Sequence, residues 1–240
     1  MLKQLNLNKV LFLDIETVPN TAAYSDLDPT FQKLWDDKIK WQAERDDKTP
    51  EEIYQRAGIF AEFGKIICIS VGFFTNADTP SVKYRTTSFA GDDEKVLLQD
   101  FSNLMNSHYY RNDQYLCAHN GKEFDYPFIA RRMLLNGINL PDLLDLAGKK
   151  PWEIKHLDSM ELWKFGDYKH YTSLNLLTNI FNIPTPKDDI TGADVAQVYY
   201  EEKDLDRIIK YCEKDTLAVA QLILRYKGMD LIEEDQVIRV

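Results

Sequence analysis

The chain has 240 residues, of which 44% are hydrophobic and 28% charged, proportions that exclude a disordered or fibrous protein and indicate one globular domain. The longest uncharged apolar run, residues 66–74, is far shorter than the roughly 20 residues of a membrane-spanning helix, so no membrane partner is expected. The formal net charge of −10, from 29 basic and 39 acidic residues, argues by itself against a protein that wraps nucleic acid electrostatically.

The three cysteines, Cys68, Cys117 and Cys212, lie far apart in the sequence and have no paired spacing. This pattern indicates neither a disulfide framework nor a zinc knuckle, and a reducing, cytoplasmic location is the simplest expectation. Lys9 and Asp14 bracket the early apolar stretch, so we expect no secretory signal.

The first expected strand covers residues 10–15, and it is apolar on both faces, which predicts a central position in a sheet. Residues 20–63 follow it as a polar and aromatic region that we interpret as an insertion of about two helices. One of these helices is expected to start at Pro50, because proline suits the first helical position. The insertion, with Trp35 and Trp41, is open to four roles: a clamp on a bound strand, a dimer contact, a lid or an amphipathic decoration of the sheet.

The rest of the chain alternates between expected strands and helices. In chain order these are strands over residues 65–74 and 81–89, a helix after Gly91-Asp92, a strand over 115–118, a helix over 125–135, a strand over 154–157, and helices over 173–181, 192–201 and 204–227. This order predicts a single α/β domain over residues 1–240 with a mixed sheet, followed at its end by an acidic tail, residues 228–240, without an assigned structure.

The first chemical motif is Asp14-Ile15-Glu16 at the end of the first strand. Residues two apart on a strand point to the same face, so the carboxylates of Asp14 and Glu16 project together and repel each other unless a cation lies between them. The alternative is an exposed strand end that carries two solvated acids.

The second motif, residues 119–125 with the sequence His-Asn-Gly-Lys-Glu-Phe-Asp, lies at a strand-to-helix junction. Asp125 is a candidate metal ligand, although this motif taken alone favours an N-cap of the following helix. Asn120 is a candidate substrate contact or a turn residue before Gly121. Phe124 is a candidate stacking partner for a terminal base or a buried core residue.

The third motif, Tyr211-Cys-Glu-Lys-Asp215, lies on the last long helix. Positions four apart stack on one helix face, and Tyr211 and Asp215 lie one step of about 100° from the apolar stripe that contains Cys212 and Thr216. Both side chains are therefore expected to flank the buried stripe. The alternative is a surface tyrosine and a charged residue at the margin of the core.

Together and in this order, the three motifs resemble those of the DEDD family of 3′–5′ exonucleases, Asp-x-Glu, Asn-x-x-x-Phe-Asp and Tyr-x-x-x-Asp. Nearly the whole chain is similar to the proofreading domain of family B DNA polymerases and to stand-alone exonucleases related to it. Ser173-Leu174, Lys187-Asp188 and residues 192–200 add to this similarity, and Tyr211 is typical of the tyrosine subgroup. The resemblance implies a ribonuclease H-like mixed β-sheet flanked by helices, with a helical insertion after the first strand.

The resemblance also implies a metal-dependent 3′–5′ exonuclease that acts on single-stranded DNA and releases nucleoside 5′-monophosphates by a two-metal mechanism. It implies two Mg²⁺ ions, for which Mn²⁺ can substitute, and a nucleic acid with a single-stranded 3′ end as partner. Tyr211 is then expected to orient the attacking water. The implied metal ligands are Asp14, Glu16, Asp125 and Asp215, and the implied substrate contacts are Thr17, Asn120 and Phe124.

Two alternatives accompany this prediction. A 3′–5′ exoribonuclease or small-oligonucleotide nuclease of the same fold is the first, and a catalytically inactive nucleic-acid-binding module is the second. All five catalytic positions are occupied by the expected residue types, which argues against the inactive module.

The acidic excess lies mainly in residues 20–64 and 187–240, so the charge favours metal-mediated capture of a few terminal nucleotides over binding of a long duplex. Asp158 is interpreted as a helix N-cap and not as a metal ligand. Some basic residues are considered for phosphate contact, although each taken alone is better interpreted as a solvated surface charge: Lys122, Arg131, Arg132, Lys149, Lys150 and Lys155.

Overall fold

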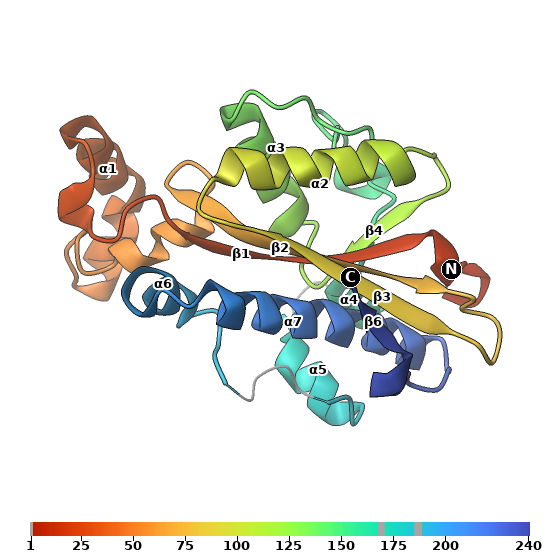
Figure 1. Cartoon of the computed structure of the whole chain (residues 1–240). Helices are drawn as coiled ribbons and strands as arrows, with labels where there is room; N and C mark the ends of the chain where they lie inside the picture. Colours follow the sequence, from red (N-terminus) through yellow and green to blue (C-terminus); the bar gives the residue numbers. More distant parts are fainter. Residues whose placement is uncertain (1, 168–170, 185–188) are drawn as a thin grey trace.

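A six-stranded mixed sheet organises the chain, with strands in the order β5-β4-β1-β2-β3-β6 and helices on both faces (Figure 1). The structure is a computed structural model that describes residues 2–167, 171–184 and 189–240. The central strand β1 (Val10–Pro19) runs antiparallel to β2 (Gly64–Thr75) and parallel to β4 (Tyr115–Ala118). The other strands are β3 (Lys83–Ala90), antiparallel to β2, β5 (Leu157–Asp158), parallel to β4, and β6 (Val237–Arg239), parallel to β3.

The α-helices cover the two faces of the sheet, with α2 and α3 on one face and α7 on the other (Figure 1). They are α1 (Pro29–Asp46), α2 (Glu94–His108), α3 (Asp125–Leu135), α4 (Ser159–Lys164), α5 (Leu174–Ile180), α6 (Val195–Gln197) and α7 (Leu205–Tyr226). The 3₁₀ helices are η1 (Leu2–Gln4), η2 (Leu7–Lys9), η3 (Tyr24–Asp26), η4 (Tyr54–Ile59), η5 (Pro151–Glu153) and η7 (Glu234–Gln236), and α6 continues as a π-helical turn, η6 (Val198–Glu202). Among the helices that the structure describes, none is long and apolar enough to cross a membrane.

The two faces of β1 are both buried, as its sequence predicts. Leu11 and Leu13 pack in one core cluster with residues of α2 and α3, whereas Phe12 packs in another cluster with residues of α7. Because side chains alternate along a strand, Asp14 and Glu16 continue the row of Phe12 and face α7. The alternation of β1 therefore decides on which side of the sheet the first motif lies.

The insertion forms a small core of its own, centred on the fully buried Trp35. The expected helix at Pro50 is wrong. Thr49 and Glu52 do exchange capping hydrogen bonds, with Glu52 Oε2 accepting from Thr49 N at 2.6 Å and Thr49 Oγ1 accepting from Glu52 N at 3.3 Å. The chain then turns into the 3₁₀ helix η4, in which Gly58 lies against the backbone of β1. A glycine weakens an α-helix, and this close approach leaves no room for a side chain.

The expected helix over residues 192–201 is also shorter in the structure, where α6 gives way to the π turn η6. This wider turn contains two neighbouring tyrosines that both hydrogen-bond to other elements. The Tyr199 hydroxyl donates to Asp92 Oδ1 at 2.7 Å, and the Tyr200 hydroxyl donates to Pro19 O at 2.5 Å. Tertiary contacts of this kind have no signature in helix propensity.

The acidic tail takes a definite place at the edge of the sheet, where β6 pairs with β3. The buried Gln221 of α7 anchors it, because its amide donates to Ile232 O at 2.8 Å and accepts from Ile232 N at 3.1 Å. The tail thus extends the sheet by one strand.

Arg132 is part of the core and not a free phosphate contact. Its guanidinium donates to both carboxylate oxygens of the buried Glu94, at 2.8 and 2.5 Å, and to Ala61 O at 2.8 Å. Glu94 also accepts from Ile66 N at 2.7 Å. The expectation that Arg132 is available for phosphate is therefore wrong, since this ion pair joins α2, α3 and the insertion.

Replacing Arg132 with methionine is expected to destabilise the protein by about 3–5 kcal/mol, because it leaves the buried Glu94 carboxylate without its charged partner. Urea unfolding at pH 7 measures the change. The neighbouring Arg131 is exposed and provides the matched control, Arg131→Met, which should change the free energy of unfolding by no more than about 0.5 kcal/mol. Equal effects of the two substitutions would contradict the structural role of Arg132.

Candidate active site

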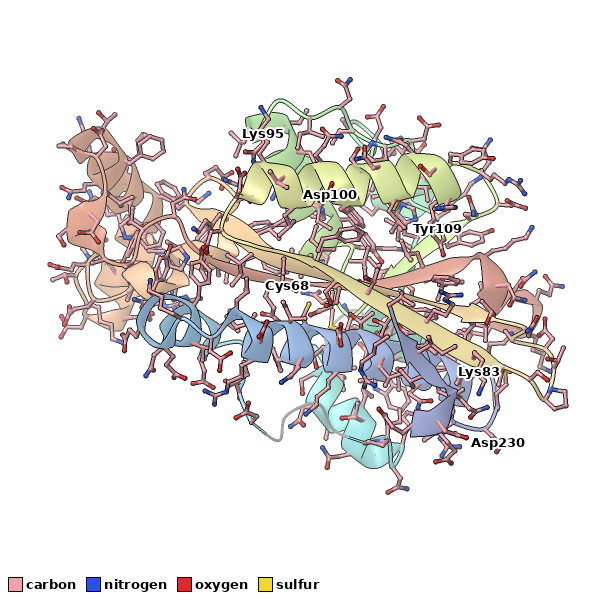
Figure 2. All side chains as sticks on the ribbon, viewed as in Figure 1. Cys68, Lys83, Lys95, Asp100, Tyr109 and Asp230 are labelled. Carbon is pink, nitrogen blue, oxygen red and sulfur yellow. The ribbon has the colours of Figure 1, made fainter. Side chains whose placement is uncertain are left out.

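Residues from all three sequence motifs meet between the sheet and α7. Asp14 and Glu16 come from β1, Asp125 is the first residue of α3, and Asp215 lies on α7. These acids lie close enough to affect one another, because the charges of Glu16, Asp215 and Asp125 add to burial in raising the pKa of the Asp14 carboxyl. Figure 2 shows Cys68, a neighbour of this group on β2, between the sheet and α7.

Asp14 and Glu16 are not solvated acids at an open strand end. Glu16 is buried and Asp14 half-buried, and the thiol of Cys212 donates to the Asp14 backbone carbonyl and to its Oδ2, both at 3.4 Å. A β-bulge interrupts the pairing of β1 with β2 between Glu16 and Thr17, and bulges commonly redirect side chains next to active sites.

The second motif forms a tight turn between β4 and α3. Asn120 has a left-handed backbone, with φ of 63°, a conformation that asparagine tolerates better than most residues. Gly121 has no space for a side chain, because a Cβ there would lie 2.5 Å from Ala118 Cβ and 2.9 Å from the Tyr126 ring. The turn then delivers Asp125 to the first position of α3.

Asp125 is not the N-cap of this helix. Phe124 occupies the cap position, and its carbonyl accepts from Phe128 N at 2.9 Å. The Asp125 side chain is buried, which raises its pKa, and the backbone amides of Asp125 and Ile15 partly offset this rise. Its carboxyl therefore lies near the strand that carries the first motif.

Asp158 anchors the turn from the neighbouring strand, a role that the sequence did not reveal. It is the N-cap of α4, as expected, and accepts from Met160 N at 2.9 Å and Glu161 N at 3.3 Å. Its two carboxylate oxygens also accept from Asn120 N and Lys122 N, each at 3.1 Å. The only sequence signal for Asp158 was its capping pattern, since the second pair of partners lies 36 to 38 residues away.

Tyr211 and Asp215 are both buried, so the surface alternative for the third motif is wrong. The pKa of Tyr211 is raised, first by burial and then by the charge of Asp215. Tyr211 therefore keeps its proton at neutral pH and can donate a hydrogen bond. Cys212, between them in sequence, points at Asp14, and the sequence had placed it only in the apolar stripe.

The implied substrate contacts are distributed around the carboxylates. Thr17 and the half-buried Phe124 line one cavity of about 450 Å³ next to Glu16. Asn120 does not line it, but the Asn120 side-chain oxygen is buried and no donor reaches it within the described part of the chain.

Other residues near the second motif have structural partners. His119 hydrogen-bonds to Ser159 Oγ at 2.8 Å and to Thr172 O at 2.9 Å, and Lys122 pairs with Glu161 at 2.7 Å. The Lys187-Asp188 segment lies outside the described residues.

Residues 59–236 match the family described as "Predicted 3'-5' exonuclease related to the exonuclease domain of PolB". The chain belongs to this family. The prediction of a 3′–5′ exonuclease is thereby confirmed, and the chain is an enzyme of this class.

The relatives of this PolB-related exonuclease include much longer proteins. The chain is 23% identical over 193 residues to a DNA polymerase of Pyrococcus glycovorans, which covers 72% of this chain and 23% of that protein. Its fold is similar to the family B DNA polymerase from the hyperthermophilic archaeon Pyrobaculum calidifontis, with a TM-score of 0.51 and 13% identity over 90% of this chain and 24% of that one. The expected ribonuclease H-like fold is confirmed, and the chain spans about a quarter of the length of these relatives.

Without a cation, the buried carboxylates of the PolB-related exonuclease repel one another. Burial is the main cause that raises the pKa of Asp14, Glu16 and Asp125, and the neighbouring acids add to it. The pKa of Asp125 rises from 3.8 to about 7. Buried carboxylates that repel one another are stabilised by a divalent cation, and carboxylate oxygens are ligands that Mg²⁺ and Mn²⁺ prefer.

The residues present fit such an ion. Ligand atoms of Asp14, Glu16 and Cys212 lie within 4.8 Å of one another. Asp125 and Asp215 are not in that closest group, but their charges act on both Asp14 and Glu16. The exonuclease family therefore has, in this chain, a donor set suited to a divalent metal.

Metal binding is expected to become stronger as the pH rises. The raised pKa values mean that the metal-free folded protein binds more protons than the unfolded chain above about pH 4, so these carboxyls cost stability as the pH increases. A cation must displace those protons. The increase in Tm caused by 10 mM MgCl₂ should be about 3–5 °C larger at pH 8 than at pH 6. Thermal unfolding at equal ionic strength measures this difference, and a pH-independent increase would contradict it.

Proposed function

We propose that this exonuclease removes nucleotides one at a time from the single-stranded 3′ end of DNA and releases nucleoside 5′-monophosphates by a two-metal mechanism. The observation that carries the proposal is the convergence of four carboxylates from β1, α3 and α7 beside Tyr211, in a buried position next to an open cavity. The position of Tyr211 supports membership of the tyrosine subgroup.

The proposed ligands of two Mg²⁺ or Mn²⁺ ions are Asp14, Glu16, Asp125 and Asp215. When bound, the ions supply an activated water and neutralise charge on the scissile phosphate and the leaving oxygen. Three different elements hold these carboxylates in place. The carboxylates therefore need to move little when the ions bind. Burial keeps bulk water away from the reacting phosphate and strengthens each electrostatic contact.

Tyr211 is proposed to orient the attacking water. Burial and the nearby charge of Asp215 raise its pKa and keep it protonated, so it acts as a hydrogen-bond donor and not as a general base. A strong protein base is unnecessary where a metal lowers the pKa of the attacking water.

The requirement for an unpaired end is supported by the size of the cavity beside Glu16. A cavity of about 450 Å³ is in the range of small-ligand sites and has room for a terminal nucleotide but not for a duplex. Thr17 and Phe124 are proposed to contact that nucleotide, with Asn120 beside them. DNA is preferred over RNA because the relatives are DNA polymerases.

The test is a time course with 5′-labelled single-stranded DNA and RNA of the same sequence in Mg²⁺. Stepwise shortening of DNA from the 3′ end, abolished by EDTA, is the expected result. Asp125→Asn should remove the activity, and Tyr211→Phe should lower kcat by about a hundredfold while metal binding persists. Shortening of RNA alone would replace the DNA assignment with the exoribonuclease alternative. Undiminished cleavage by Asp125→Asn would refute the proposed ligand set.

A further inference from the structure

A groove runs from Glu16 between the insertion and α6. The cavity of about 450 Å³ that contains Thr17 and Phe124 is also lined by Arg56 and Ile59 of η4 and, opposite them, by Ala196 of α6. A second cavity of about 310 Å³ shares lining residues of both walls with the first. Figure 1 shows the insertion beyond one end of the sheet, close to α6. The two cavities are thus neighbouring parts of one groove that leads away from the carboxylates.

The insertion wall of this groove is fixed to β1. A Cβ at Gly58 would lie 3.1 Å from the carbonyl carbon of Val18, so η4 touches the strand just beyond Glu16 with no side chain between them. The Tyr54 hydroxyl is hydrogen-bonded to Thr21 Oγ1 at 2.8 Å, and the buried Trp35 donates to Pro50 O at 2.9 Å. The wall therefore has a defined position relative to the metal ligands, as a binding subsite requires.

Arg56 is the cation of the first cavity. Among the residues that line it, the charged ones are Glu16 and Arg56. The Arg56 side chain is exposed, and in the described parts of the chain it forms neither a hydrogen bond nor a close ion pair; its charge acts at longer range on Asp46, which is paired with Arg45. This contrasts with Arg132 and Lys122, whose charges are paired with acids. A guanidinium that projects unpaired into a groove beside an anion-cleaving centre is suited to a phosphate, which it can hold with two parallel hydrogen bonds.

We infer that η4 of the insertion is a substrate subsite, in which Arg56 binds a backbone phosphate of the single strand. Ile59 is about half exposed and lines the same cavity as Phe124, so the two present apolar surface to a nucleobase next to that phosphate contact. The strand leaves the carboxylates through the groove between η4 and α6. This inference rests on the proposed nuclease function and gives the insertion the role of a fixed clamp.

The test measures binding and turnover separately in Arg56→Gln. Binding of a 3′-phosphorothioate (dT)₁₂ is followed by fluorescence anisotropy in Ca²⁺ over a range of KCl concentrations. The expected Kd increases about five- to tenfold, and the slope of log Kd against log [KCl] falls by about 0.7, because one phosphate contact is lost. In the cleavage assay the loss should appear as an increase in KM of similar size, because Arg56 is inferred to bind substrate and is not a metal ligand.

The matched controls separate this role from general effects. Lys33 is another exposed cation of the insertion and does not line the groove, so Lys33→Gln should leave the Kd and the salt slope unchanged. Arg56→Lys should restore the salt slope but only part of the affinity, because a lysine keeps the charge without the planar fork. Thermal unfolding of Arg56→Gln should match the wild type.

Three results would overturn the inference. An unchanged Kd and salt slope in Arg56→Gln, or an equal loss in Lys33→Gln, removes the subsite while the nuclease assignment stands as long as the wild type shortens DNA. A wild-type protein that neither binds nor shortens DNA in any divalent metal removes the proposed function itself, and the inference with it.

Discussion

Asp14→Asn is expected to lower kcat/KM for single-stranded DNA by about a thousandfold or more, while the metal-free protein becomes as stable as the wild type or more stable. The activity falls because a proposed metal ligand loses its charge. The stability rises because the Asp14 carboxyl is half-buried among Glu16, Asp125 and Asp215, which raise its pKa together with burial. An asparagine has the same shape and no charge, so the repulsion disappears.

The pH at which the stability is measured decides the sign of this effect. The raised pKa of Asp14 means that its stabilising contribution is complete only at low pH and is lost as the pH rises through the folded-state pKa. Urea unfolding in EDTA at pH 8 should therefore show Asp14→Asn at or above the wild type, and addition of Mg²⁺ should reverse the order. Asp142 is exposed, and Asp142→Asn controls for a change in net charge. A large loss of stability of Asp14→Asn in EDTA would contradict this prediction, because it would show that the Asp14 carboxylate stabilises the metal-free fold.

Asp158→Ala is expected to have the largest effect on stability among residues outside the carboxylate cluster, a loss of about 3–4 kcal/mol. The buried carboxylate accepts four backbone N–H bonds, two at the start of α4 and two in the turn that precedes Asp125. With these bonds removed, the turn that positions Asp125 loosens, so kcat/KM should also fall at temperatures where the variant is folded.

Asp28→Ala is the matched control for this prediction. Asp28 caps α1 through a single bond to Thr30 N at 2.8 Å, at an exposed site in the insertion. Its loss should reduce the free energy of unfolding by about 1 kcal/mol and leave kcat/KM unchanged. Similar losses in the two variants would mean that Asp158 acts only as a helix cap.

Much of the secondary structure was predictable because its signals are local. The helix α3 has the expected bounds, Asp125–Leu135, and Gly137 follows its C-cap with a left-handed φ of 69° that glycine adopts readily. The central position of β1 followed from its two apolar faces. The α-helix expected at Pro50 does not form, although the capping residues Thr49 and Glu52 are hydrogen-bonded to each other. The contacts of Gly58 with the distant strand β1 determine the backbone conformation of this segment.

In the candidate site, too, local sequence patterns predicted some features, and only the tertiary structure revealed the others. The resemblance of the three motifs to those of the DEDD exonucleases named the acids and Tyr211, and the spacing predicted that Asp14 and Glu16, and likewise Tyr211 and Asp215, share a side. The N-cap alternative for Asp125 could be rejected only in three dimensions, where Phe124 takes the cap and the Asp125 side chain is buried. Cys212 appeared as an apolar residue in sequence and proved to be hydrogen-bonded to Asp14.

The sequence by itself determined the α/β class, the order of most strands and helices, and the residue types of a metal-dependent 3′–5′ exonuclease. These properties depend on periodicity and on short motifs, which are complete within a few neighbouring residues. Only the tertiary structure decided that Asp158 anchors the second motif, that Arg132 is paired with Glu94, and that Arg56 stands unpaired in the groove. Each of these depends on which distant segments the packing of the core brings into contact, and no local pattern records that choice.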